Sequence, residues 1–188
     1  MRRLVLAALP AALLAAGCGS AAQTTKNPEP QGSATPARVR HVAVGAALGL
    51  TAPARPDGTG VLHMAVKVKR VLPRALGRGG FDRPRKGERF VAALFVLKNI
   101  GTTPYADSPT YGAKAIDSHG HGYDPTVVSV AAGPGFPKVV RMRHGQVRAG
   151  YIVFAVPRAT KITAVRYALN GGIASDAGEW RMPETPSR

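Results

Sequence analysis

Residues 61–71 alternate between apolar and mostly polar side chains. Apolar residues fall at every second position, at Leu62, Met64, Val66 and Val68. Polar residues stand between them, at His63, Lys67 and Lys69. A period of two residues is typical of a β-strand with one buried face and one solvated face. The segment therefore predicts a strand in a layered β-structure.

Further short apolar runs follow, separated by turn residues. They cover residues 41–51, 90–97, 111–117, 123–130, 139–142, 147–156, 162–169 and 180–182. The chain holds 22 Gly and 16 Pro, so turns are frequent, and no 3.6-residue amphipathic stretch stands out after residue 17. This regular spacing predicts an all-β fold, a β-sandwich of seven to nine strands.

Two of these runs, 90–97 and 151–156, are apolar on both faces. We expect them to be central strands that face each other across the sandwich. Phe154 and Trp180 are expected to fill the core. Asn99 and Gly101 suit a turn that needs unusual backbone angles.

The start of the chain is typical of an export signal. Two arginines precede an apolar run over residues 4–16, which is shorter than the roughly 20 residues of a membrane-spanning helix. The sequence Leu14-Ala15-Ala16-Gly17-Cys18 follows and resembles the lipobox of bacterial lipoproteins. The resemblance implies cleavage between Gly17 and Cys18 and attachment of lipid, including fatty acids such as palmitate, to Cys18. The alternative is a plain secretory signal cleaved near Ala16.

The chain then divides into four parts. These are a signal peptide over residues 1–17, a lipidated disordered tether over 18–39, a sandwich domain over 40–183 and a tail over 184–188. The tether is rich in small and polar residues and proline, and it has no hydrophobic period. We therefore expect the protein at the outer face of a bacterial plasma membrane, held there by the lipid on Cys18.

The chain is strongly basic, with a formal net charge of +16. Such a charge favours anionic partners such as lipid head groups or wall polymers. Basic residues are dense over 67–89, and our candidates for binding an anionic partner are Arg74, Arg78, Arg83, Arg85, Lys86 and Arg89. Phe81 is the one aromatic residue in that stretch, and this argues against nucleic acid as the partner. The alternative interpretation is a solvated loop.

Candidates for catalysis are few. Cys18 is the sole cysteine, which excludes an intrachain disulfide and a four-cysteine zinc site. The GxSxG, SxxK and HExxH motifs are absent, and the glycines near Gly79 lack the GK[ST] of a phosphate-binding loop. The sequence therefore predicts no catalytic residues, no cofactor and no enzymatic activity.

One alternative stays open in a turn with two histidines. His119 and His121 stand near Asp117 and Asp124, and zinc and copper accept imidazole and carboxylate ligands. Two histidines two residues apart do not fix a tetrahedral site, so an exposed turn is the simpler interpretation. The alternative function is a metal-binding or enzymatic envelope protein that uses residues 117–124.

Several features, taken in order, are similar to a known domain. Residues 90–101 form an apolar run that ends in Asn-x-Gly, and residues 115–123 contain Ala-Ile-Asp with a later Gly and Tyr. Residues 150–157 contain Gly-x-x-x-Phe-x-Val-Pro, and Tyr167 and Trp180 fall in the closing strands. This order resembles the small immunoglobulin-like domain of bacterial lipoproteins and secreted antigens, which includes an immunoprotective-antigen (telokin-like) type and a domain of unknown function. The resemblance implies an immunoglobulin-like β-sandwich outside the cytoplasm and carries no catalytic residues.

Together these observations predict a monomeric, non-enzymatic binding module of the cell envelope. Its expected partners are the membrane, through the lipid on Cys18, and a protein or an anionic envelope polymer.

Overall fold

The computed structural model describes residues 38–54 and 59–183. The predicted signal peptide, Cys18, most of the predicted tether and the tail over 184–188 lie outside the described residues. The first strand, β1 (Arg38–Ala43), begins inside the predicted tether. It begins there because it pairs in parallel with the last strand, from Arg38 opposite Asp176 to Ala43 opposite Arg181.

Strands dominate the described chain. Besides β1, the longer strands are β2 (Ala47–Pro53), β3 (Val61–Ala75), β4 (Glu88–Asn99), β6 (Ala113–Asp117), β10 (Val147–Pro157), β11 (Ile162–Ala168) and β12 (Asp176–Arg181). The shorter ones are β5 (Tyr105–Asp107), β7 (Gly122–Tyr123), β8 (Pro125–Thr126) and β9 (Val140–Met142). Two 3-10 turns, η1 (Pro109–Gly112) and η2 (Asn170–Gly172), complete the described elements. None of the helices in the described part is long and apolar enough to cross a membrane.

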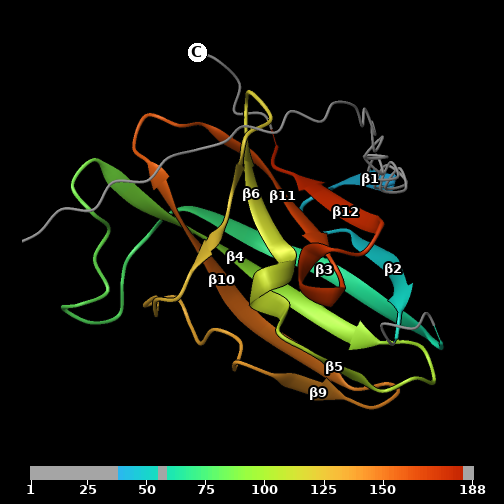
Figure 1. The fold of residues 1–188 in the computed structure, drawn as a ribbon. Helices are drawn as coiled ribbons and strands as arrows, with labels where there is room; N and C mark the ends of the chain where they lie inside the picture. The colour runs from blue at the N-terminus through green and yellow to red at the C-terminus, as the bar shows by residue number, and fades with distance from the viewer. Residues whose placement is uncertain (1–37, 55–58, 184–188) are drawn as a thin grey trace, which may run out of the picture. The chain divides into compact units, whose positions relative to one another are not determined.

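Two five-stranded sheets form the two layers of the fold (Figure 1). One sheet has the order β1-β12-β11-β6-β7, the other has the order β2-β3-β4-β10-β8, and β5 and β9 form a small third sheet. The neighbouring strands are antiparallel except for the pair β1 and β12. This arrangement confirms the predicted all-β sandwich, although its two main sheets hold ten of the described strands where seven to nine were expected.

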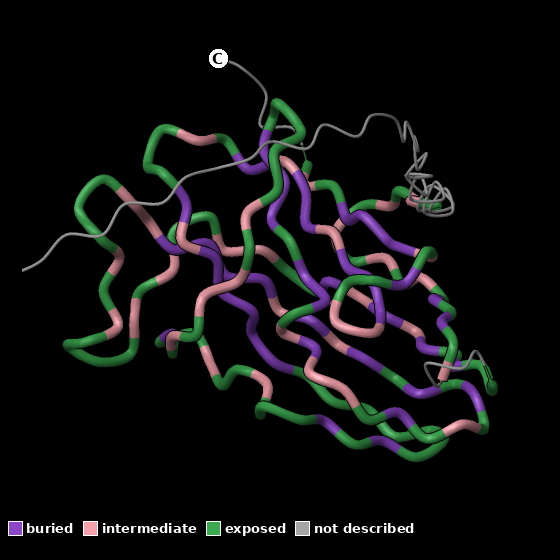
Figure 2. Tube along the Cα trace, in the orientation of Figure 1, coloured by how far each residue is buried: buried purple, intermediate pink, exposed green. Residues whose placement is uncertain are grey.

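The main hydrophobic core lies between the two sheets (Figure 2). The ring centroid of Phe95 lies 5.3 Å from that of Tyr167 and 6.4 Å from that of Trp180. The indole N–H of Trp180 donates to the carbonyl oxygen of Ala46 over 2.9 Å, so the one polar atom of this side chain is satisfied. Trp180 and Phe154 are both fully buried, which confirms their predicted place in the core.

The predicted relation between residues 90–97 and 151–156 is wrong. β4 and β10 do not face each other but are antiparallel neighbours in one sheet, with Leu94 opposite Tyr151. Both faces of these strands are buried because a second hydrophobic cluster covers the side away from the main core. That cluster consists of Phe90, Ala92, Val130, Tyr151 and Val153. Val130 comes from the connection that precedes β9.

The role predicted for Asn99 and Gly101 is wrong as well. Neither residue has a positive φ, and Asn170 is the one non-glycine residue of the described part that does. Asn99 is fully buried, and its side-chain amide donates to the carbonyl oxygens of Thr103 (2.9 Å) and Met142 (3.1 Å). Its side-chain oxygen accepts from the N–H of Gly101 over 3.0 Å. The asparagine therefore holds the end of β4 by hydrogen bonding.

Candidate anion-binding site

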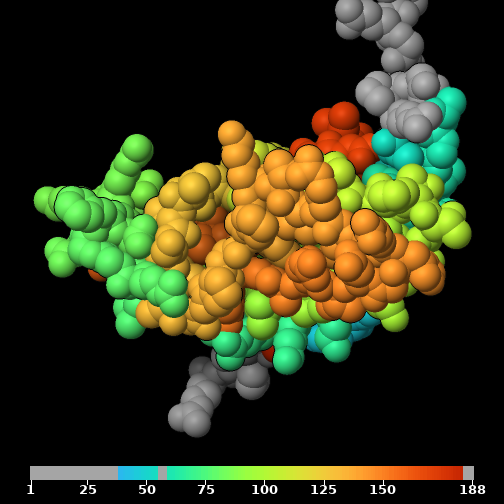
Figure 3. All heavy atoms as spheres, turned by 90° about the horizontal axis from the view of Figure 1, so that it is seen from below, coloured from blue at the N-terminus to red at the C-terminus, as the bar shows by residue number. Residues whose placement is uncertain are grey.

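The predicted basic segment forms the end of β3, a loop over residues 76–87 and the start of β4. Figure 3 shows the loop as a green lobe at one end of the sandwich. The N–H of Arg78 donates to the carbonyl oxygen of Ser129 and the N–H of Ala131 donates to that of Leu76, each over 2.9 Å. These two hydrogen bonds fix the base of the loop against the connection that carries Val130.

Asp82 stabilises the loop from within. Its carboxylate accepts hydrogen bonds from the backbone N–H groups of Gly79 and Ser129, each over 3.3 Å. Gly77 is required beside it, because a Cβ on Gly77 would lie 1.6 Å from the carbonyl oxygen of Asp82. The carboxylate of Asp82 thus has a structural task at the loop base.

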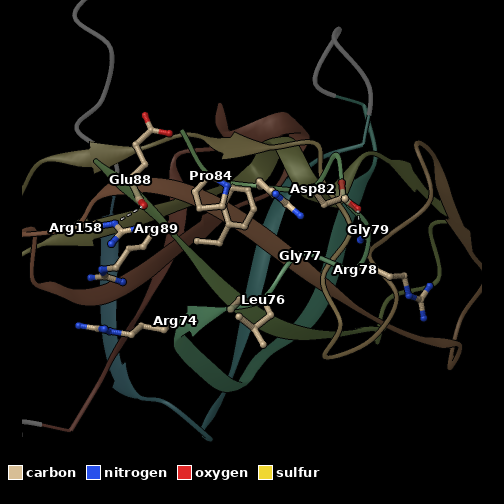
Figure 4. Close-up of a pocket in the computed structure, with 14 residues that line it drawn as sticks. Arg74, Leu76, Gly77, Arg78, Gly79, Asp82, Pro84, Glu88, Arg89 and Arg158 are labelled. Carbon is tan, nitrogen blue, oxygen red and sulfur yellow. Dashed lines mark hydrogen bonds between the residues drawn. The ribbon is translucent and has the colours of Figure 1, made fainter. Parts of the chain in front are cut away.

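A cavity of about 690 Å³ lies beside this loop, a size typical of small-molecule sites. We call it the loop cavity. Five arginines line it: Arg74, Arg78, Arg83, Arg89 and Arg158. Figure 4 shows that Arg74, Arg89 and Arg158 gather at one end, whereas Arg78 lies at the other, beyond Leu76. The first three residues are called the arginine cluster below.

Backbone carbonyl groups hold two members of the arginine cluster. Arg89 donates from Nη2 to the carbonyl oxygen of Thr160 over 2.7 Å and from Nη1 to that of Pro73. Arg158 donates from Nε to the carbonyl oxygen of Glu88 over 3.2 Å. These acceptors are neutral, so they orient the guanidinium groups and leave their charges uncompensated.

The pKa of Arg89 is sensitive to its surroundings in the arginine cluster. Burial lowers the pKa of Arg89, and the positive charge of Arg74 lowers it further. A guanidinium nevertheless stays protonated in a protein. Arg74 and Arg89 are therefore two charged groups close enough to repel each other.

The two acids that line the loop cavity do not neutralise the cluster. Asp82 is engaged at the loop base, and the carboxylate of Glu88 points away from the three guanidinium groups (Figure 4). Within residues 38–54 and 59–183, no ion pair joins a carboxylate to Arg74, Arg89 or Arg158. An excess of positive charge in a concave site favours an anionic ligand.

The structure brings together only some of the predicted binding residues. Arg74, Arg78, Arg83 and Arg89 line the loop cavity, but Arg85 and Lys86 do not. Arg158 was missed, since it follows a strand far along the chain. The register of β10 against β4 places it here, because Pro157 pairs with Glu88. A single arginine after a strand gives no signal until that register is known.

The turn over residues 117–124, which the sequence offers only as an alternative metal site, is called the histidine turn below. Asp117, His119 and His121 each offer a ligand atom, and these atoms lie within 4.8 Å of one another. Asp124 is not part of this group and forms an ion pair with Lys114 instead.

The carboxylate of Asp117 already has several hydrogen-bond partners. Its Oδ1 accepts from the backbone N–H groups of His119 (2.8 Å) and His121 (2.9 Å), and its Oδ2 accepts from the hydroxyl of Tyr123 over 3.1 Å. Burial acts to raise the pKa of Asp117, but these hydrogen bonds outweigh it and the pKa is lowered. The aspartate is thus ionised and buried, while both histidines are exposed.

Solved structures resemble this sandwich at low sequence identity. The secreted protein MPT63 of Mycobacterium tuberculosis is 18% identical, with a TM-score of 0.51 over 79% of this chain and 99% of MPT63. A β-sandwich protein of Clostridium difficile 630 is 9% identical, with a TM-score of 0.46 over 82% of this chain and 100% of its own. YcdA, a candidate lipoprotein of Bacillus subtilis, is 11% identical, with a TM-score of 0.47 over 63% of this chain and 35% of YcdA. At such identities, the likeness to MPT63 concerns the fold alone.

No curated protein matches the sequence significantly. A family match is nevertheless present and covers most of the described sandwich. Residues 57–178 match the family described as a domain of unknown function, DUF4352. This range runs from before β3 into β12. It includes the loop over residues 76–87, the histidine turn and Arg158. The chain belongs to the DUF4352 family.

Proposed function

We propose that this protein is a lipid-anchored, non-enzymatic binding module of the bacterial cell envelope, and that it holds an anionic ligand in the loop cavity. The ligand class is a phosphate- or carboxylate-bearing envelope polymer. The observation that carries the proposal is the arginine cluster, in which three guanidinium groups share one cavity and none is paired with a carboxylate of the described residues. Arginine suits such a site because its planar group binds phosphate and carboxylate through paired hydrogen bonds.

The proposed fold type is immunoglobulin-like. If β3 is taken as the first strand, the order β3-β4-β10-β8 corresponds to strands A-B-E-D of an immunoglobulin sandwich. The order β6-β11-β12 in the other sheet corresponds to strands C-F-G. β1 and β2 then extend the two sheets at their edges. Such sandwiches present loops at their ends, and the loop cavity lies in one of these positions.

The proposed address rests on the leader and on Cys18. The apolar run that ends in Gly17-Cys18 supports lipid attachment outside the cytoplasm. MPT63, which shares the fold, is a secreted protein. Growth of expressing cells with a palmitate analogue tests the anchor: we expect label on the wild type and none on Cys18→Ala. Label that persists on Cys18→Ala, or none on the wild type, contradicts the anchor.

Binding is tested by retention of the purified full-length protein on isolated cell-wall material. We expect retention to fall by about tenfold or more between 50 and 500 mM salt, because charge contacts are screened. Arg74→Gln/Arg158→Gln is expected to lose most of the retention at low salt. Lys98→Gln/Arg141→Gln removes the same charge from exposed positions that do not line the loop cavity and serves as the control. Equal losses for the two variants would reject the loop cavity as the site.

A second candidate function is metal capture at the histidine turn, and the close approach of the ligand atoms of Asp117, His119 and His121 favours it. Exposed imidazole groups beside an ionised carboxylate suit Zn²⁺ or Cu²⁺. Calorimetric titration with either ion tests this candidate. Heat at micromolar metal that disappears in His119→Ala supports it, and the absence of heat for the wild type removes it.

A further inference from the structure

A second cavity adjoins the loop cavity. It measures about 890 Å³ and runs from the later part of β3 across β11 and β12. We call it the strand cavity. Its lining comes from strands of both sheets, so residues that are distant in the sequence meet there.

The strand cavity is also rich in positive charge. Its basic lining residues are Lys69, Arg70, Arg89, Lys161, Arg166 and Arg181, against the acids Asp117 and Glu179. Glu179 is already paired with Arg166 over 2.7 Å and lies 3.6 Å from Arg181, and Asp117 is engaged in its turn. No acid of the described chain pairs with the exposed side chains of Lys69 and Lys161. The cavity therefore keeps a net positive charge.

The position of Lys69 follows from an irregularity in β3. The register of β3 against β4 shifts between Val68 and Arg70, which leaves Lys69 at a bulge. A bulge changes the direction of side chains at that point of a strand. The regular alternation of residues 61–68 therefore ends where the strand reaches the strand cavity.

The two cavities meet at a ridge that is itself basic. Arg89 lines both cavities. Of two consecutive residues in β3, Pro73 lines the strand cavity and Arg74 lines the loop cavity. The turn after β10 contributes in the same way, with Arg158 in the loop cavity and Lys161 in the strand cavity. A ligand that crosses this ridge stays in contact with positive charge along its path.

We infer that the ligand of this protein is an extended polyanion that occupies both cavities and passes over Arg89, not a small anion confined to one of them. This inference rests on the proposed function, because it takes the arginine cluster as the primary contact. Each cavity alone has the size of a small-molecule site, so the pair offers room for several charged repeats. Contacts of one chain in two adjoining sites add to its affinity, since the second contact is intramolecular.

Chain length is the variable that tests the inference. The probes are tripolyphosphate, which is too short to fill both cavities, and a polyphosphate of about 50 phosphate units. Their affinities for the purified full-length protein in mild detergent are measured by calorimetry at several salt concentrations. We expect the long chain to bind more tightly per molecule and to show the steeper dependence on salt, because it displaces more counterions.

Two double variants separate the cavities. Lys69→Gln/Lys161→Gln removes two charges from the strand cavity, and Lys98→Gln/Arg141→Gln removes two exposed charges that line neither cavity. At about fivefold for each lysine near a polyanion, we expect the first variant to lose about 25-fold in affinity for the long chain. Its loss for tripolyphosphate should be clearly smaller, so that the ratio of the two affinities falls. The second variant should keep the ratio of the wild type.

Two results would overturn the inference. If Lys69→Gln/Lys161→Gln keeps the ratio of the wild type, the strand cavity holds no part of the chain and the inference is overturned, while the proposed function stands. If Arg74→Gln/Arg158→Gln binds both probes as well as the wild type does, the proposed function fails and the inference fails with it. Circular dichroism of each variant confirms that the fold is unchanged.

Discussion

Asn99 is a buried polar side chain with three hydrogen bonds to backbone groups. Its amide joins the end of β4 to Thr103 and to Met142 at the end of β9, and its oxygen holds the N–H of Gly101. A buried polar group is tolerated only when it is hydrogen-bonded. Asn99 thus connects the end of β4 to the end of β9, two strands that are not neighbours in any sheet of the described residues.

We expect Asn99→Ala to lower the free energy of unfolding by about 3 kcal/mol, because it removes three hydrogen bonds and leaves a cavity in place of a fully buried side chain. Urea unfolding measures the change. The neighbouring exposed substitution Lys98→Ala is the control and should stay within about 0.5 kcal/mol of the wild type. A loss of less than about 1 kcal/mol for Asn99→Ala would show that water replaces the amide.

The ionisation of one buried side chain, that of Glu179, links the stability of the fold to pH. Burial acts to raise the pKa of Glu179, but the hydrogen bond and charge of Arg166, together with His41, outweigh it and lower the pKa below its ordinary value of 4.5. A carboxyl with a lowered pKa in the folded state stabilises the fold at pH values above its unfolded pKa. That stabilisation is lost as the pH falls through the folded pKa.

The free energy of unfolding should therefore decrease as the pH falls from 5 toward 3, and part of this decrease should vanish in Glu179→Gln. Urea unfolding midpoints at several pH values provide the measurement. Since Asp117 also has a lowered pKa, Glu179→Gln is expected to remove only part of the slope. An identical slope in the variant and the wild type would contradict the role given to Glu179.

At the scale of elements, β12 is packed closely on its two edges and on its inner face. It pairs with β1 on one side and β11 on the other, and Gly178 within it packs against the ring of Trp180 and against Leu48. A Cβ on Gly178 would lie 2.7 Å from the indole ring and 2.9 Å from Cδ1 of Leu48. The strand accepts no side chain at this position.

Gly178→Ala should accordingly destabilise the fold by about 1–3 kcal/mol through overpacking. Gly49→Ala is the matched control in β2, because no atom lies within 4 Å of a Cβ at that position. Thermal unfolding of both variants compares them directly. A Gly178→Ala protein as stable as Gly49→Ala would mean that β12 can move away from Leu48.

The elements themselves were the most predictable part of this fold. Residues 61–71, 90–97, 147–156 and 162–169 were expected to be strands, and all are, to within one residue. The run over residues 41–51 is instead divided between β1 and β2, which lie in different sheets. The signals that mark the four confirmed strands are local: alternation for residues 61–71 and 162–169, and continuous apolar runs for residues 90–97 and 151–156. Their partners could not be read in this way, because β4 and β10 are apolar on both faces and such strands fit either one sheet or two facing sheets. The second cluster around Val130 decides between these arrangements, and it depends on a long connection.

The binding site was predictable only in part for the same reason. The dense basic segment pointed to Arg74 and Arg89. Arg158 and Lys161 reach the site through the register of β10, and Lys69 does so through a bulge. Register and bulges depend on long-range pairing, so a single sequence carries no sign of them.

At the scale of the whole molecule, the buried indole of Trp180 lies between the two sheets, so its fluorescence is sensitive to the unfolding of either one. Trp180 is the sole tryptophan; it lies in β12, contacts Phe95 of the other sheet and bonds to Ala46 between β1 and β2. We expect urea transitions followed by its fluorescence and by far-ultraviolet circular dichroism to coincide, since one core joins the two sheets. Separate midpoints would indicate that the sheets unfold independently.

The arginine cluster also affects the folded protein when nothing is bound. Like charges held together by backbone carbonyl groups destabilise the native state, and any anion that settles among them relieves this repulsion. The choice of buffer should therefore change heat resistance: the melting temperature is expected to be higher in phosphate than in chloride at equal ionic strength. The difference in melting temperature between the two buffers should be clearly smaller for Arg74→Gln/Arg158→Gln, because Arg89 alone remains of the arginine cluster and only the general stabilising effect of phosphate persists in full.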